Sequence, residues 1–206
     1  IPLGPPAYDY TPRHVNDDVA GYACILTKLR FDQLHMENAL LHFRSATGPL
    51  GPLARNENRS APDIVIGCDL IKSFGFVQID YPRHAVIIAS TSEYAPDANT
   101  LIATVPLREM EGSFAADGAI DGEKQLFLLD SAGEFEIAMD NPSSDKLKQV
   151  SVGDIVFRNV SVVDSKGQGL GLLKYPRIGR QLLSKFKVTF VPKKKLVHFE
   201  RPAGTE

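Results

Sequence analysis

Residues 126–138 read LFLLDSAGEFEIA, and this stretch decides the fold. Its apolar run predicts a buried strand, and the strand ends at Asp130, which is followed by three small residues, Ser131, Ala132 and Gly133. Burying a carboxylate is costly unless it is paired or hydrogen-bonded. Asp130 is therefore the first candidate for a functional side chain. Upstream, the strand belongs to a predicted hairpin over 113–129, in which Asp121-Gly122 supplies the positive φ angles of a tight turn.

The composition limits the classes of function. The chain has 206 residues, of which 43% are hydrophobic, and a formal net charge of −2. This suits one packed domain or two small lobes, and the near-neutral charge favours no nucleic-acid partner. No apolar run approaches the roughly 20 residues of a membrane span. The histidines and the two cysteines, Cys24 and Cys68, show no metal-ligand spacing. We therefore expect no metal and no cofactor.

The remaining pattern is all-β with an internal duplication. Short apolar runs recur between Gly, Pro, Asp and Asn residues, and two short helices are predicted at Cys68–Phe74 and Arg180–Phe186. Residues 64–88 resemble residues 176–200, because both contain Ile-Gly, a leucine, a phenylalanine and a final pair of extended runs. We predict two pseudo-repeated β lobes, 1–95 and 96–206, each with a short helix.

Two motifs in the second lobe carry a family resemblance. Leu128-Leu129-Asp130-Ser131 is similar to the hydrophobic-hydrophobic-Asp-Thr/Ser pattern of retropepsin-like aspartic peptidases, and Ile178-Gly179-Arg180 is similar to their Ile-Gly-Arg segment. The resemblance implies the acid-protease (retropepsin-like) fold, with a degenerate first lobe. It also implies an aspartic-type endopeptidase with a peptide or protein substrate, no cofactor, and a periplasmic or secreted location.

The resemblance assigns roles to particular residues. Two aspartates from two lobes share a proton, because like charges that close cannot both ionise, and Asp130 would be one of them. The Ser131 hydroxyl would hold the two loops together, and Glu134 would pair with Arg180 to brace the loop. Ala132 departs from the glycine that the family carries at this position.

The second aspartate is the open question. Asp18 is one candidate, since the spacing from Asp18 to Asp130 equals that from Gly67 to Gly179, and Asp9 is a weaker one that is expected in a turn. The segment between Asp130 and Gly153 leaves little room for the mobile hairpin that covers the substrate in active members. Three interpretations stay open. The protein is a homodimer in which each chain supplies one Asp130, a processed or incomplete form of a longer two-lobe peptidase, or an inactive homologue that acts as a peptide-binding or scaffold protein.

Overall fold

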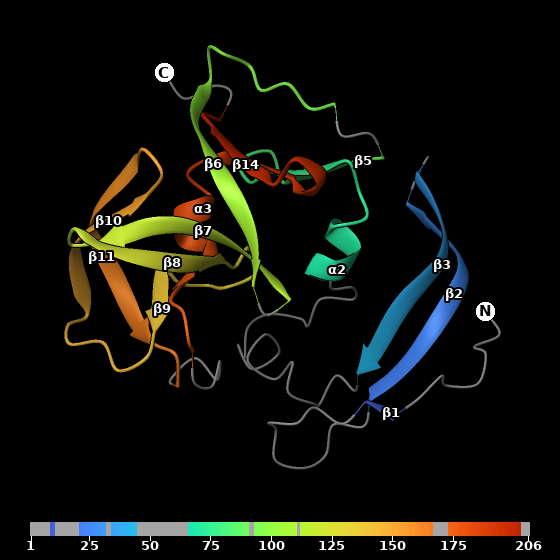
Figure 1. The fold of residues 1–206 in the computed structure, drawn as a ribbon, viewed down its shortest axis with the longest axis horizontal. Coiled ribbons are helices and arrows are strands. Elements are labelled where there is room, and N and C mark those ends of the chain that lie inside the picture. The colour runs from blue at the N-terminus through green and yellow to red at the C-terminus, as the bar shows by residue number, and fades with distance from the viewer. Residues whose placement is uncertain are drawn as a thin grey trace. The chain divides into compact units, whose positions relative to one another are not determined.

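The computed structural model describes strands at residues 9–10, 21–31 and 34–44, and then residues 66–90, 93–110, 112–166 and 173–202. Contacts divide the chain into two compact units, Ile1–Val65 and Ile66–Glu206. In the first unit, β1 (Asp9–Tyr10), β2 (Gly21–Phe31) and β3 (Leu34–Arg44) form an antiparallel sheet (Figure 1). The predicted loop over 45–62 lies outside the described residues.

The second unit contains a closed barrel of six strands. Its order is β7-β8-β12-β9-β11-β10, and β10 pairs back with β7. The β8–β12 and β9–β11 pairs are parallel, and the other pairs are antiparallel. The strands are β7 (Ser113–Ile120), β8 (Glu123–Leu129), β9 (Ile137–Met139), β10 (Lys146–Val152), β11 (Ile155–Asp164) and β12 (Arg177–Ile178).

Two local features build this barrel. Asp121 and Gly122 have φ angles of 48° and 90° and join β7 to β8, so the predicted hairpin and its turn are confirmed. At Gly118, a Cβ atom would lie 2.0 Å from the carbonyl oxygen of Ser151. Glycine therefore lets β7 approach β10 closely enough to close the barrel.

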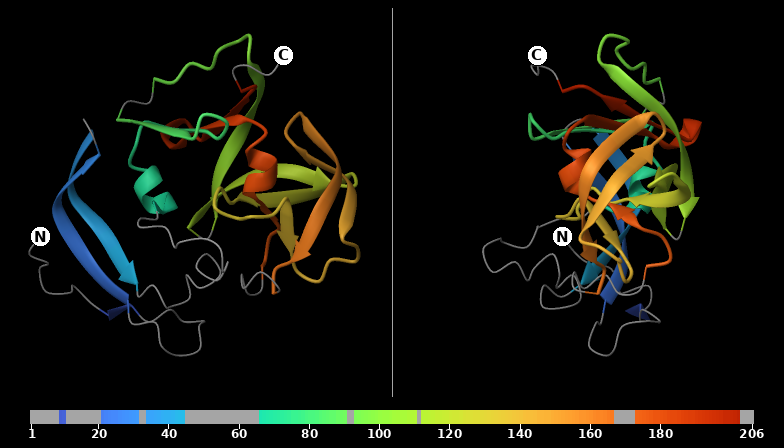
Figure 2. Two further views of the ribbon diagram at one scale, coloured as in Figure 1. Left: turned by 180° about the vertical axis from the view of Figure 1, so that it is seen from behind. Right: turned by 90° about the vertical axis from the view of Figure 1, so that its left-hand side faces the viewer.

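Five further strands extend the sheet away from the barrel in the order β6-β14-β13-β4-β5. They are β6 (Leu101–Met110), β14 (Leu196–Glu200), β13 (Lys187–Val191), β4 (Phe76–Asp80) and β5 (Ala85–Ala89). β6 pairs with β14 through its first half and with β7 through its second half, and Figures 1 and 2 show it running from the β14 hairpin to the barrel.

The predicted repeat is visible as two copies of a helix followed by a hairpin. One copy is α2 (Cys68–Ile71) with β4 and β5, and the other is α3 (Arg180–Leu183) with β13 and β14. Each helix is shorter than predicted, because the residues after it form turns. The hairpins pair through β4 and β13, and at the middle of this pairing Gln78 Nε2 donates to Thr189 Oγ1 at 2.9 Å.

The core fills the barrel and continues under the extended sheet. Phe114, Phe127 and Phe199 are almost fully buried, as are Leu182 and Leu183 of α3. The strand burial alternates where one face meets solvent, as in β6. This all-β architecture with a six-stranded barrel and few helices confirms the predicted acid-protease-like fold class. No helix in the described ranges is long and apolar enough to cross a membrane.

Candidate functional site

Asp130 lies directly after β8, in a tight loop. Its backbone N–H donates to the carbonyl oxygen of Ile178 at 2.9 Å. Its Oδ1 accepts hydrogen bonds from the backbone N–H groups of Ala132 at 3.2 Å and Gly133 at 3.0 Å. The side chain is only 16% exposed. These two donors satisfy one carboxylate oxygen and fix the orientation of the other.

The other oxygen of Asp130 contacts an arginine that the sequence analysis did not single out. Arg177 Nη1 lies 3.1 Å from Asp130 Oδ2. The contact arises because β12 runs parallel to β8, with Arg177 opposite Leu128 and Ile178 opposite Leu129. Arg177 is visible in the sequence only as the residue before Ile178-Gly179, which carries no signal of this contact.

The Asp130 loop is pressed against the start of α3. Arg180 N–H donates to the carbonyl of Gly133 at 2.7 Å, and Gly179 N–H donates to the carbonyl of Glu136 at 2.9 Å. A Cβ atom at Gly179 would lie 2.1 Å from the carbonyl oxygen of Phe135 and 2.9 Å from that of Gly133. The Ile-Gly-Arg motif therefore serves to let two backbone segments touch.

The predicted partners Glu134 and Arg180 are brought together. Arg180 Nη2 lies 2.5 Å from each oxygen of the Glu134 carboxylate. Gln181 Nε2 adds a hydrogen bond to the Glu134 carbonyl at 3.1 Å. Both charged side chains are more than a third exposed, so solvent screening limits the pair to about 0–1 kcal/mol of stability.

The other predicted residues have different outcomes. Ser131 is half-buried and Ala132 is exposed in the same loop. Asp18 lies outside the described residues. Asp9 was expected in a turn, but it lies in β1 opposite Tyr22, so that expectation is wrong. Only residues 140–145 join β9 to β10, and they form bends, so this connection holds no covering hairpin.

Two residues of the first repeat lie within electrostatic range of Asp130. Burial raises the pKa of Tyr81 to about 12, the nearby charge of Arg180 opposes this increase, and the negative charge of Asp130 adds to it. Burial also raises the pKa of the Cys68 thiol, with a smaller contribution from Asp130 in the same direction. The negative charge of Asp130 therefore acts on groups in the turn after β4 and at the start of α2.

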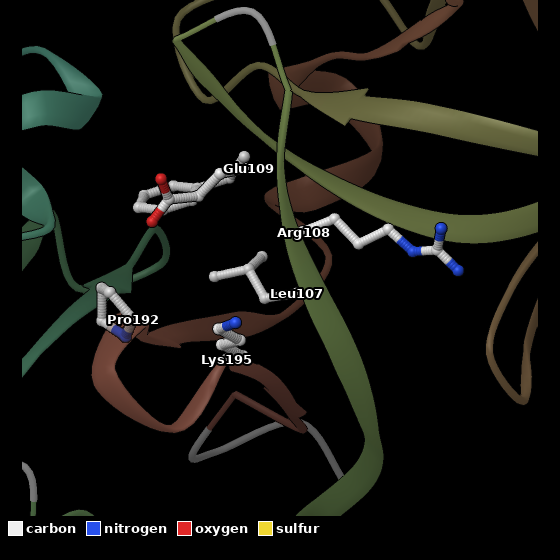
Figure 3. A pocket seen from close by; sticks show the side chains of 6 residues that line it. Leu107, Arg108, Glu109, Pro192 and Lys195 are labelled. Atoms are coloured by element: carbon white, nitrogen blue, oxygen red, sulfur yellow. The ribbon is translucent and has the colours of Figure 1, made fainter.

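Two surface hollows lie elsewhere. One, of about 380 Å³, lies between the β6–β7 hairpin and the 3-10 helix Pro192–Lys194. Figure 3 shows Leu107 and Glu109 on one side of β6 and the Arg108 guanidinium on the other. A more open hollow of about 780 Å³ includes Arg108, Asp117 and Tyr175. Neither is lined by Asp130 or by the residues predicted to act with it. Across the described ranges, no cluster of three His, Cys, Asp or Glu side chains could hold a metal ion.

Comparison with known proteins gives a likeness of fold. No protein-family model matches the chain, and no curated protein matches it. Among solved structures, conglutin gamma, a basic 7S globulin from lupine seeds, is similar with a TM-score of 0.50 and 12% identity over 89% of this chain and 67% of that chain.

Two further solved structures have lower TM-scores. Basic 7S globulin from soybean has a TM-score of 0.47 and 12% identity over 87% of this chain and 66% of that chain. A retropepsin-like aspartic protease from Rickettsia conorii has a TM-score of 0.35 and 19% identity over 48% of this chain and 89% of that chain. At these identities, the comparisons concern the fold alone.

Proposed function

We propose that this chain is an aspartic-type endopeptidase in which Asp130 supplies one of the two carboxylates that activate a water molecule. The observation that carries the proposal is the fixed carboxylate at the end of β8: Oδ1 is held by two backbone N–H groups, and the loop is pressed against Gly179. Such preorganisation holds the catalytic oxygen in one place without further reorganisation.

The reaction needs a second carboxylate and one shared proton. The ionised carboxylate takes a proton from water while the protonated one polarises the peptide carbonyl. Under this proposal, the second carboxylate comes from Asp18 or from Asp130 of a second copy. If Asp18 supplies the second carboxylate, Asp18→Asn abolishes cleavage. If Asp130 of a second copy supplies it, activity per chain falls as the protein is diluted.

A non-catalytic peptide-binding protein is the second candidate function. The Arg177–Asp130 ion pair favours it, because the guanidinium occupies the carboxylate oxygen that would otherwise face the substrate. The exposed Ala132, where the family carries glycine, points the same way. The ion pair is compatible with catalysis only if something displaces Arg177.

The test is peptide cleavage at acid pH by the wild type, Asp130→Asn and Asp117→Asn. Asp117 is a matched control, because it is an exposed carboxylate that pairs with Arg108 at 2.6 Å. We expect Asp130→Asn to lower the cleavage rate by about 10²–10⁴-fold and Asp117→Asn to leave it unchanged. Equal cleavage by wild type and Asp130→Asn refutes the endopeptidase proposal. Peptide binding without any cleavage by the wild type supports the second candidate.

A further inference from the structure

A buried polar atom without a partner, Arg177 Nε, points to a ligand beside Asp130. Within the part of the chain that the structure describes, two buried side-chain atoms lack a hydrogen-bond partner: Tyr81 Oη and Arg177 Nε. Arg177 contacts Asp130 directly, and Tyr81 lies within electrostatic range of it. Buried polar groups in folded proteins are almost always satisfied. The unsatisfied Nε of Arg177 therefore indicates that this guanidinium has a further acceptor in the functional state.

The geometry of Arg177 indicates what this acceptor is. Asp130 contacts only Nη1 of the guanidinium, because Asp130 Oδ1 is already held by the backbone N–H groups of Ala132 and Gly133. A guanidinium is a planar fork of five donors that matches a carboxylate in a two-pronged contact. The Arg177 side chain is also 28% exposed, so part of it is open to solvent.

Arg180, in the same segment, provides a comparison, because its contacts brace the loop. Its Nη2 contacts both oxygens of Glu134, and its backbone N–H holds the loop. The Arg177 contact is different, because it leaves a buried donor unsatisfied and engages the one carboxylate oxygen that the loop leaves available. The single-pronged contact with Asp130 is thus one that a better-matched carboxylate can replace.

We propose that Arg177 determines specificity by binding a carboxylate of the substrate, a Glu or Asp side chain beside the scissile bond, and thereby releases Asp130. This inference rests on the proposed peptide-handling function and names its substrate class. Without an acidic ligand, Arg177 forms its ion pair with Asp130 again.

The decisive experiment measures binding, so that it does not depend on cleavage. The probes are two fluorescently labelled synthetic peptides, identical except for Glu or Gln at one position and taken from a library screened against the Asp130→Asn protein. Asp130→Asn removes the negative charge that competes for Arg177. We expect this variant to bind the Glu peptide about tenfold or more tightly than the Gln peptide by fluorescence anisotropy, as one well-placed charge pair allows.

The controls separate recognition from folding. Adding Arg177→Leu to Asp130→Asn removes both members of the ion pair, so no buried charge is left unpaired, and the preference for Glu should disappear. Arg177→Lys keeps the charge but loses the fork, and should retain only part of the preference. Arg108→Leu, at the exposed Asp117 pair, should leave it unchanged.

The outcomes keep the two proposals distinct. This inference is overturned if the preference for Glu persists after Arg177→Leu is added to Asp130→Asn. It is also overturned if Asp130→Asn binds both peptides equally or binds neither of them. If peptide cleavage does not depend on Asp130, by contrast, only the endopeptidase proposal is refuted. If the wild type cleaves peptides, the Glu peptide should be cleaved faster than the Gln peptide, and Arg177→Leu should remove that difference.

Discussion

Gly179 and Gly67 are two matched positions at which alanine substitution tests the packing of the Asp130 loop. Both glycines precede a short helix at its N-cap position, and both have extended backbone angles, with φ and ψ of −90° and 177° at Gly179 and −76° and 162° at Gly67. Alanine is compatible with these angles in both cases. The two sites differ in their surroundings, because a Cβ atom at Gly67 would meet nothing within 4 Å.

The expected effect follows from the contacts at Gly179. Its Cβ atom would lie 2.1 Å and 2.9 Å from the carbonyl oxygens of Phe135 and Gly133, and 2.5 Å from the Phe135 ring. The backbone oxygens are held by hydrogen bonds and cannot move freely. Overpacking of this kind costs about 3 kcal/mol. The capping and unfolded-chain effects of Gly→Ala are common to both variants.

The difference between the two variants therefore isolates the steric contribution. We expect Gly179→Ala to unfold about 6–12 °C below Gly67→Ala, given roughly 2–4 °C per kcal/mol for a chain of this size. The measurement is thermal unfolding followed by circular dichroism. Melting temperatures that agree within about 2 °C would refute the reasoning, since the loop could then not be packed against β12 and α3 as described.

Two further predictions concern buried groups. Glu200 is fully buried and its carboxylate lies 3.0 Å from Lys187 Nζ, so Glu200→Ala should lower the free energy of unfolding by about 3 kcal/mol; a urea midpoint within error of the wild type would contradict this. Tyr81 has a pKa raised to about 12 in the folded chain, and the unfolded tyrosine ionises near 10, so its contribution to stability should be complete below about pH 10 and lost between about pH 10 and 12. Tyr81→Phe should therefore reduce the loss of stability at alkaline pH. Tyr94, whose pKa is also raised to about 12, should account for part of the loss that remains. If the urea midpoint of Tyr81→Phe depends on pH as that of the wild type does, the result counts against the burial of Tyr81.

The fold was predictable where local chemistry sets the geometry. Asp121-Gly122 determines the turn between β7 and β8, since both residues adopt positive φ angles that this pair tolerates. The two Ile-Gly segments marked the starts of α2 and α3, because the glycines are N-caps. The helix ends were predicted too late, at Phe74 and Phe186, because one apolar residue at helical spacing does not distinguish a further turn from a helix.

The site was predictable only where a motif links its parts. The Glu134–Arg180 contact follows from a family pattern that pairs the loop with the helix. The Arg177–Asp130 contact joins residues 47 positions apart, and it depends on the parallel pairing of β8 with β12. A two-residue strand has no periodicity of its own. Its partner and direction are set by closure of the barrel, which single-sequence patterns do not reveal.

The segment Pro176-Arg177-Ile178-Gly179-Arg180 joins the end of a buried strand to the start of α3. Ile178 is buried in the core, which leaves Arg177, its neighbour on a strand, on the opposite face beside Asp130. Gly179 then begins α3, which carries Arg180 to the exposed Glu134. Substitution at Arg180 should therefore affect loop stability, whereas substitution at Arg177 should affect ligand selection. The two arginines have different partners because the chain changes from strand to helix between them.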